Sequence, residues 1–296
     1  MYKSLLSVFF IIAGTIQNFA QNDLLEMIAE EEAVRPELTT ATFKTTRLIN
    51  GHTIEQVAGG VLDFRVSHRF GLINSGLYEF FGLDQATTRI GLDYGIANRL
   101  MIGIGRSTYE KQVDGFMKYK LLRQSSGAKA TPLTLSVLTA MVYKTQKFDN
   151  PTRENFPSSH LYYTFQLLAA KKFTESFSFQ LMPTVNHYNL VPGTTLSNDL
   201  FSLGLGGRIK LSKRVTVNAE YYYQLPNYRF LETKNSLGIG ADIETGGHVF
   251  QLYFTNSLGM TERTFINETT GDFLKGDIHF GFCISRVFTL KDPRKE

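Results

Sequence analysis

The chain has 296 residues, a formal net charge of +4 and a hydrophobic fraction of 43%. Its mean hydropathy of −0.12 argues against a bundle of transmembrane helices, which would be far more apolar. The single cysteine, Cys283, excludes an intrachain disulfide and a cysteine metal cluster. No block of lysine and arginine indicates nucleic-acid binding.

The first residues predict a cleavable secretory signal. Lys3 precedes an apolar run from Leu5 to Ala13, and Ala20 is a small residue before the polar Gln21. The run is too short to cross a bilayer as a helix. We therefore expect a signal peptide over residues 1–20, the alternative being a buried N-terminal core helix.

Residues 21–55 are predicted to form a periplasmic N-terminal segment. Residues 22–34 are rich in glutamate and indicate a short acidic helix that ends near Pro36. Residues 39–56 are polar and extended in character, as in a lead-in strand or a periplasmic arm. The acidic helix could recruit a periplasmic partner, close the periplasmic opening of a barrel, or form only a solvated face. The sequence leaves open whether this segment enters a barrel.

From residue 56 to 290 the hydrophobic pattern has a period of two. Leu62 and Phe64 alternate with Asp63 and Arg65, and the same alternation recurs along the chain. There are about 12 such runs, each close to the length of a tilted transmembrane strand. One face of each run is apolar almost throughout, while the other carries charges and glycines. This predicts an all-β fold, a transmembrane antiparallel β-barrel, followed by a C-terminal tail over residues 291–296.

The lengths of the predicted links support this fold. Short links are expected at 97–99, 125–131, 170–176, 212–214 and 245–248, and long ones at 71–87, 107–114, 145–159, 188–200, 225–234 and 257–275. Short turns at one end and long loops at the other are typical of bacterial outer-membrane barrels, with short periplasmic turns and long extracellular loops. We therefore expect the chain in the bacterial outer membrane, surrounded by its lipid and inserted by the barrel-assembly machinery.

From about Phe43 to Leu290 the chain resembles an uncharacterised bacterial family of membrane-bound β-barrel domains of unknown function. The resemblance is carried by Phe43–His52, Ser67–Gly71, Lys118–Gln124, Asp242–Leu252 and Gly276–Phe288. It implies the fold, and it implies no chemistry.

Charges on the second face of the runs predict the lining of a polar lumen. The predicted lumen-lining residues are Asp63, Arg65, Arg69, Arg89, Asp93, Lys118, Lys120, Arg208, Lys210, Glu220, Asp242, Glu244 and Asp277. Because basic and acidic residues are nearly balanced, we expect salt bridges across the lumen rather than a filter of one sign. The lumen is then either a narrow polar pore or a hydrated, structurally filled interior, since a 12-stranded barrel lies between filled and open sizes.

The sequence offers little support for two kinds of reactive site. Asp242, Glu244, His248 and His279 are metal-ligating types, but the alternation places His248 on the other face from Asp242, opposite Thr245 at a hairpin turn. A lipid hydrolase would need a serine paired with a histidine on the lipid-facing rim. The rim histidines are His68 and His187, and the serines near them are Ser75, Ser197 and Ser202. No Gly-x-Ser-x-Gly motif is present, so no enzyme and no cofactor is predicted.

The link 71–87 carries Leu77, Phe80, Phe81 and Asp84 at helical spacing. This predicts a short amphipathic helix that packs at the mouth of the barrel or gates it.

Three functions are compatible with these features. The first is a passive, porin-like channel for small polar solutes. The second is a non-transporting structural or interaction barrel that binds a partner through its long loops or its N-terminal helix. The third is a lipid-modifying membrane enzyme. Fold alone does not choose between them.

Overall fold

The computed structural model describes residues 36–127, 130–148, 152, 154–191, 193, 196–230 and 232–291. The predicted signal peptide, the predicted acidic helix and all but the first residue of the C-terminal tail lie outside the described residues. Within the described part of the chain, no helix is long and apolar enough to span a bilayer.

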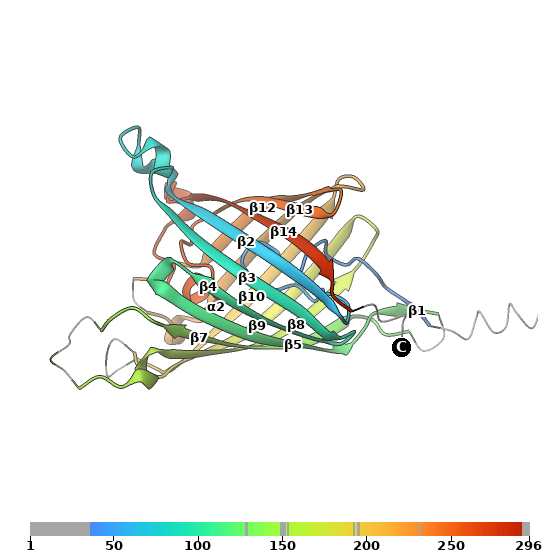
Figure 1. Cartoon of the computed structure of the whole chain (residues 1–296), viewed down its shortest axis with the longest axis horizontal. Coiled ribbons are helices and arrows are strands. Elements are labelled where there is room, and N and C mark those ends of the chain that lie inside the picture. The colour runs from blue at the N-terminus through green and yellow to red at the C-terminus, as the bar shows by residue number, and fades with distance from the viewer. Residues whose placement is uncertain are drawn as a thin grey trace, which may run out of the picture. The chain divides into compact units, whose positions relative to one another are not determined.

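The described residues form a closed barrel of 12 antiparallel strands (Figure 1). In chain order the strands are β2 (Val61–Leu72), β3 (Ala86–Ala97), β4 (Leu100–Ser107), β5 (Gln112–Leu122), β7 (Thr134–Lys144), β8 (Leu161–Lys172), β9 (Phe177–Tyr188), β10 (Asp199–Lys210), β11 (Val215–Gln224), β12 (Ser236–Thr245), β13 (His248–Thr255) and β14 (His279–Thr289). Each strand pairs with its neighbour in the barrel order, and β14 pairs with β2 to close the sheet. The fold predicted from the alternation is confirmed.

The two faces of the strands have opposite chemistry. On β3 the apolar side chains of Ile90 and Leu92 are 49% and 42% exposed, whereas their neighbours Arg89 and Asp93 are buried. Apolar residues on the outside and charged residues on the inside are the reverse of a soluble protein and match a sheet surrounded by lipid. Closure of the barrel also leaves no unpaired strand edge, which a hydrocarbon environment requires.

The links between strands gather at two ends, which we call the hairpin end and the loop end. Residues 98–99, 173–176, 211–214 and 246–247 connect strands tightly at the hairpin end, where Thr245 pairs with His248. The loop end carries the links 73–85, 108–111, 145–160, 189–198, 225–235 and 256–278. The link 108–111 is shorter than the alternation suggested, and the link 123–133 is longer and contains β6 (Ser125–Ser126). Loop lengths are therefore sorted less regularly than predicted.

A second, small unit consists of β6 and β1 (Glu37–Leu38), which pair as a two-stranded sheet.

The link after β2 does not form the predicted amphipathic helix. It contains two short 3-10 turns, η1 (Ile73–Ser75) and η2 (Phe80–Gly82). Positive φ angles at Gly76, Phe81 and Gly82 interrupt any continuous helix. The side chains of Leu77 and Tyr78 are 74% and 92% exposed, so they do not pack at the mouth either. The helical spacing of the apolar residues was misleading because the glycines set the backbone conformation.

Candidate functional site: the filled lumen

The interior of the barrel is occupied by residues 41–58, which we call the lumen hairpin. Its two arms are joined by backbone hydrogen bonds from Leu48 to the carbonyl of Gly51 at 2.8 Å and from Thr53 to that of Thr46 at 3.0 Å. An antiparallel bridge pairs Arg47 with His52, and His52 is fully buried. The sequence analysis assigned residues 41–55 to a periplasmic segment and left open whether this segment enters the barrel. In the structure, residues 41–58 lie inside the barrel, before β2.

The lumen is also entered from the loop end. The long link between β13 and β14 contains the helix α2 (Glu262–Asn267), all of whose residues are buried. Thr261 and Thr264 cap its first turn reciprocally, which stabilises so short a helix. Phe265 and Ile266 join an apolar cluster with Leu48 and Ile54 of the lumen hairpin. The two inserted segments therefore pack against each other inside the barrel.

Glycines on the inner face of the strands make room for the hairpin. A Cβ atom on Gly95 would lie 2.1 Å from the carbonyl oxygen of Ala58, and one on Gly206 would lie 2.8 Å from Leu48. Strand β12 leaves similar space for Ile49 at Gly238 and Gly240. The glycines that alternate with apolar residues in the sequence thus lie where the wall meets the inserted segment.

The tip of the hairpin is bound by Glu220 of β11. Its carboxylate accepts hydrogen bonds from the backbone N–H groups of Ile49, Asn50 and Gly51 at 3.1, 2.8 and 3.0 Å. Hydrogen bonds to an ionised group are roughly twice as strong as those between neutral groups. Gln180 of β9 binds the returning arm, accepting from the N–H of Ile54 at 2.9 Å and donating to the carbonyl of His52 at 2.8 Å.

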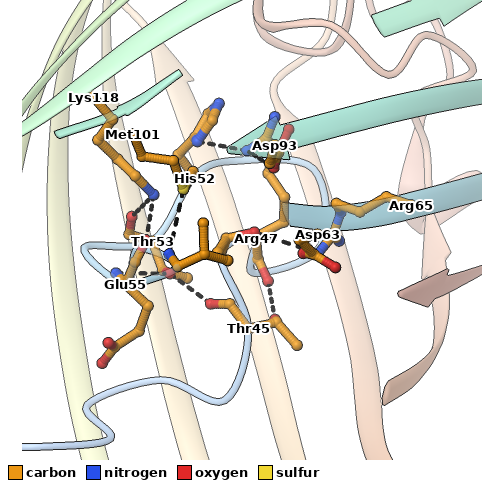
Figure 2. Close-up of polar contacts among 12 residues, drawn as sticks. Thr45, Arg47, His52, Thr53, Glu55, Asp63, Arg65, Asp93, Met101 and Lys118 are labelled. Atoms are coloured by element: carbon orange, nitrogen blue, oxygen red, sulfur yellow. Dashed lines mark hydrogen bonds and ion pairs between the residues drawn. The ribbon is translucent and has the colours of Figure 1, made fainter. Parts of the chain in front are cut away.

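A second anchor lies on β4 and β5 (Figure 2). The fully buried ammonium of Lys118 donates to the backbone carbonyls of Thr53 at 2.8 Å and Glu55 at 2.5 Å. The N–H of Val57 donates to the sulfur of Met101 at 3.5 Å. The barrel wall thus satisfies the backbone of the hairpin much as a strand ladder would, which is required for an irregular segment that is buried.

Arg69 of β2 connects the barrel wall with the lumen hairpin and with the loop-end link that carries α2. Its guanidinium donates to the carbonyls of Ser257 and Gly259 in the loop-end link, at 2.6 Å each, and to the side-chain oxygen of Asn50 at the tip of the hairpin. Arginine suits this role because its planar fork carries five N–H donors.

Several other charged residues of the interior form buried ion pairs. Arg89 binds Asp114 through two contacts, with the Nε–Oδ1 distance at 2.9 Å, and Arg65 lies 3.4 Å from Asp63. Arg47 of the hairpin lies 3.7 Å from Asp93 (Figure 2). A pocket of about 20 Å³, roughly the room of one water molecule, lies among Arg47, Arg65 and Arg89. The side chains around it therefore fill this part of the lumen.

Most of the predicted lumen-lining residues are buried inside the barrel. These are Asp63, Arg65, Arg69, Arg89, Asp93, Lys118, Arg208, Glu220 and Asp242. The others are less buried: Lys120 and Lys210 are partly exposed, and Glu244 is exposed and contacts Lys44 of the hairpin. Asp277 lies in the link before β14, where it accepts a hydrogen bond from Asn74 at 2.7 Å.

Several interior residues were missed by the sequence analysis. Asp114 lies on the same strand face as Lys118, and extending that alternation backwards would have found it. Arg47, His52 and Glu262 lie in segments without strand periodicity, so no pattern assigned them to the lumen. Their polar character in a chain of this type was the only available signal.

Among the described residues we find neither a metal-ligand cluster nor, at the rim histidines, the serine–histidine pair of a lipid hydrolase. There, no group of three or more His, Cys, Asp or Glu residues could hold a metal ion. His68 bonds Thr88 at 3.0 Å and His187 pairs with Asp199 at 2.7 Å, so neither rim histidine is joined to a serine.

Residues 43–288 match the family of membrane-bound β-barrel domains designated DUF5777. The chain belongs to this family. The match to DUF5777 begins at Phe43, so it includes the lumen hairpin and not only the strands. No curated protein matches the chain.

Among solved structures, the DUF5777 chain is similar in fold to several outer-membrane porins and channels. The NanC porin has a TM-score of 0.48 at 12% identity, with 78% of this chain and 100% of that chain covered. The KdgM porin has a TM-score of 0.48 at 9% identity, with 77% and 99% covered. An outer-membrane channel of the COG4313 group from Pseudomonas putida F1 has a TM-score of 0.46 at 12% identity, with 83% and 100% covered. Likenesses at this level concern the fold alone.

Proposed function

We propose that this protein is a gated channel of the bacterial outer membrane. It is closed while the lumen hairpin occupies the barrel and passes small polar solutes while the hairpin is displaced. The observation that carries the proposal is that the barrel wall holds the backbone of the hairpin through hydrogen bonds, beside the apolar contacts of side chains such as Leu48 and Ile54. Glu220, Gln180 and Lys118 hold the hairpin through hydrogen bonds to its backbone.

Hydrogen bonds of this kind suit a segment that leaves. Water can replace each of them when the hairpin moves, so that the cost of displacement comes mainly from exposing the apolar clusters around Leu48 and Ile54. A permanently filled interior would be more stable with apolar packing than with buried ion pairs, which often gain nothing over hydrophobic residues of similar volume. The wall that displacement uncovers carries Arg65, Arg89 and Asp63 and would hydrate readily.

Movement of the hairpin would also loosen α2. Phe265 and Ile266 pack against Leu48 and Ile54 in one cluster, and Glu262 faces His52. Once the hairpin leaves, the helix loses these contacts, and six residues are too few to remain helical without tertiary packing. The obstruction of the lumen by α2 therefore depends on the presence of the lumen hairpin. The mixed signs of the lumen charges support passage of small polar solutes without strong preference for one ionic sign.

A second candidate is a barrel that never conducts and acts by binding. It is favoured by the insertion of two segments, from opposite ends of the barrel, into one lumen. In that case a periplasmic partner would bind the region before the hairpin, and the loops at the other end would face outward.

Swelling of proteoliposomes in neutral sugars, amino acids and small salts tests the proposal. The variant Glu220→Leu orphans the N–H groups at the hairpin tip and should raise the swelling rate severalfold over the wild type. Glu175→Leu is the matched control, because Glu175 is an exposed carboxylate whose ion pair among the described residues is with Lys172. Equal rates for the two variants, with both barrels folded, would contradict gating by the hairpin and favour the second candidate.

A further inference from the structure

A cavity of about 540 Å³ opens at the loop end, between the link after β2, the link 108–111 and the long link before β14. Its size falls within the range of small-molecule binding sites. It is separate from the anchors of the lumen hairpin, none of which lines it.

The walls of the cavity are fixed by close backbone contacts. A Cβ atom on Gly82, where φ is +84°, would lie 2.5 Å from the backbone of Gly71. One on Gly271 would lie 2.7 Å from the carbonyl oxygen of Asn256. These glycines all line the cavity. Such approaches allow only glycine and leave the loops little freedom to rearrange, so the cavity is preformed.

The lining combines polar and apolar groups and lacks lysine and arginine. Its two carboxylates already have partners: Glu268 accepts from Tyr188 at 3.0 Å and from Arg263 at 2.8 Å, and Asp277 accepts from Asn74 and from the N–H of Asp272. An anionic ligand would find no cation, and a cationic ligand would compete with existing bonds.

Neutral hydrogen-bonding groups remain available. The hydroxyl of Thr87 is buried without a hydrogen-bond partner among the described residues, and Thr270 supplies a further hydroxyl. The hydroxyl of Thr269 donates to the carbonyl of Phe265 at 2.8 Å and can only accept from a ligand. The Nδ1 atom of His279 lies 2.9 Å from the carbonyl of Phe70 and must donate to it, which leaves Nε2 as an acceptor. The half-buried Tyr109 adds an aromatic ring.

We propose that this cavity binds a small neutral polyhydroxylated ligand, such as a mono- or disaccharide. The clustered hydroxyl and imidazole groups, with the amide of Gln85, match the alternating donors and acceptors of a sugar, and an aromatic ring matches its apolar face. The site needs no assumption about conduction. If the proposed gating also holds, the ligand would contact the link that carries α2, because Thr264 and Glu268 line the cavity.

Saturation-transfer NMR on the full-length protein, in a detergent without a sugar headgroup, tests the site. The probes are maltose, cellobiose and diacetylchitobiose as neutral disaccharides, with digalacturonate and the chitosan dimer as charged ones. At least one neutral probe should bind about tenfold more tightly than either charged probe, a difference of about 1.4 kcal/mol. The absence of binding by every neutral probe, or tighter binding of a charged one, would overturn the proposal.

Two variants locate the binding. Thr270→Trp and Ser75→Trp fill the cavity from exposed positions, and either should weaken binding of the neutral probe about tenfold or more. Leu274→Trp is the matched control, because Leu274 is 94% exposed in the same link and does not line the cavity. Unchanged affinity in a folded cavity-filling variant would overturn the assignment. Binding is measured without conductance, so this test and that of the gated channel fail independently.

Discussion

The Nε2 atom of His52 lies 3.3 Å from a carboxylate oxygen of Glu262. His52 belongs to the lumen hairpin and Glu262 to the first turn of α2, so this contact joins two segments that enter the barrel from opposite ends. Arg47 contacts the other ring nitrogen at 2.6 Å. Because arginine can only donate, Nδ1 of His52 accepts and the proton of the neutral ring lies on Nε2, facing Glu262. The two inserted segments therefore meet at His52 inside the barrel.

A methyl group at position 51 should expel the hairpin. The Cβ atom of Gly51→Ala would lie 2.1 Å from the hydroxyl oxygen of Tyr222, which is fully buried. We expect limited proteolysis within residues 41–58 to become much faster, while the strands remain protected. Gly207→Ala is the control, since a Cβ atom there meets nothing within 4 Å. Tyr222→Phe removes the clashing oxygen and should partly restore protection in the double variant. Equal cleavage of Gly51→Ala and Gly207→Ala would show that the contact is not constraining.

The pair formed by Arg89 and Asp114 should behave as a coupled unit. Asp114→Asn leaves a buried guanidinium without its countercharge and should lower the free energy of unfolding by about 3 kcal/mol. The double variant Arg89→Leu/Asp114→Leu removes both charges and should be more stable than either single variant. Urea unfolding in vesicles gives the comparison, with Asp199→Asn at an exposed site as control. Additive losses in the double variant would mean that the two residues act separately.

Glu110, in the link between β4 and β5, should stabilise the loop end in a pH-dependent way. Burial opposes its ionisation, but Arg263 at 2.6 Å and Lys144 at 2.9 Å outweigh burial and lower its pKa to about 2. A depressed pKa stabilises the folded state above the unfolded pKa of about 4.5, and this stability is lost as the pH falls towards about 2.

We therefore expect Glu110→Gln to be less stable than the wild type at pH 7 by about 2 kcal/mol, after allowance for solvent screening. The difference should shrink between about pH 4.5 and pH 2 and vanish below that range. Unfolding curves of both proteins across this range provide the measurement. A difference that did not change with pH would assign the effect to packing rather than charge.

The orientation in the membrane can be tested on intact cells. An epitope tag in the link 145–159 should be accessible to antibody, whereas a tag at 245–247 should be accessible only after lysis. This follows from placing the loop end outside and the hairpin end in the periplasm. The opposite labelling pattern would reverse the orientation.

The alternation of apolar and polar residues was enough to predict the barrel, because in lipid each strand must present an apolar outer face. Strands such as β3 and β10 were located directly from it. The lumen hairpin could not be predicted in the same way. Its residues are held by hydrogen bonds to strands that are distant in the sequence, and they have no hydrophobic period of their own. Glu220 was assigned to the lumen, but its backbone partners were not.

The inner-face glycines carried more information than the sequence analysis used. Gly95, Gly206 and Gly238 alternate with apolar residues, and in a barrel filled only by side chains they would leave voids. Their spacing indicates that something else fills the interior. In the link after β2, the spacing of Phe80 and Phe81 predicted a helix. Gly76 and Gly82, which were not considered, indicate turns instead.

Single-channel recording in planar bilayers tests the central claim most directly. The full-length mature protein is compared with a variant that lacks residues 36–58, after both are shown to be folded barrels by heat-modifiable migration. We expect the full-length protein to remain closed except for brief openings, and the shortened protein to give long, steady conductance steps. Steady conductance of the full-length protein would contradict closure by the lumen hairpin, and silence of both proteins would contradict its role as the gate.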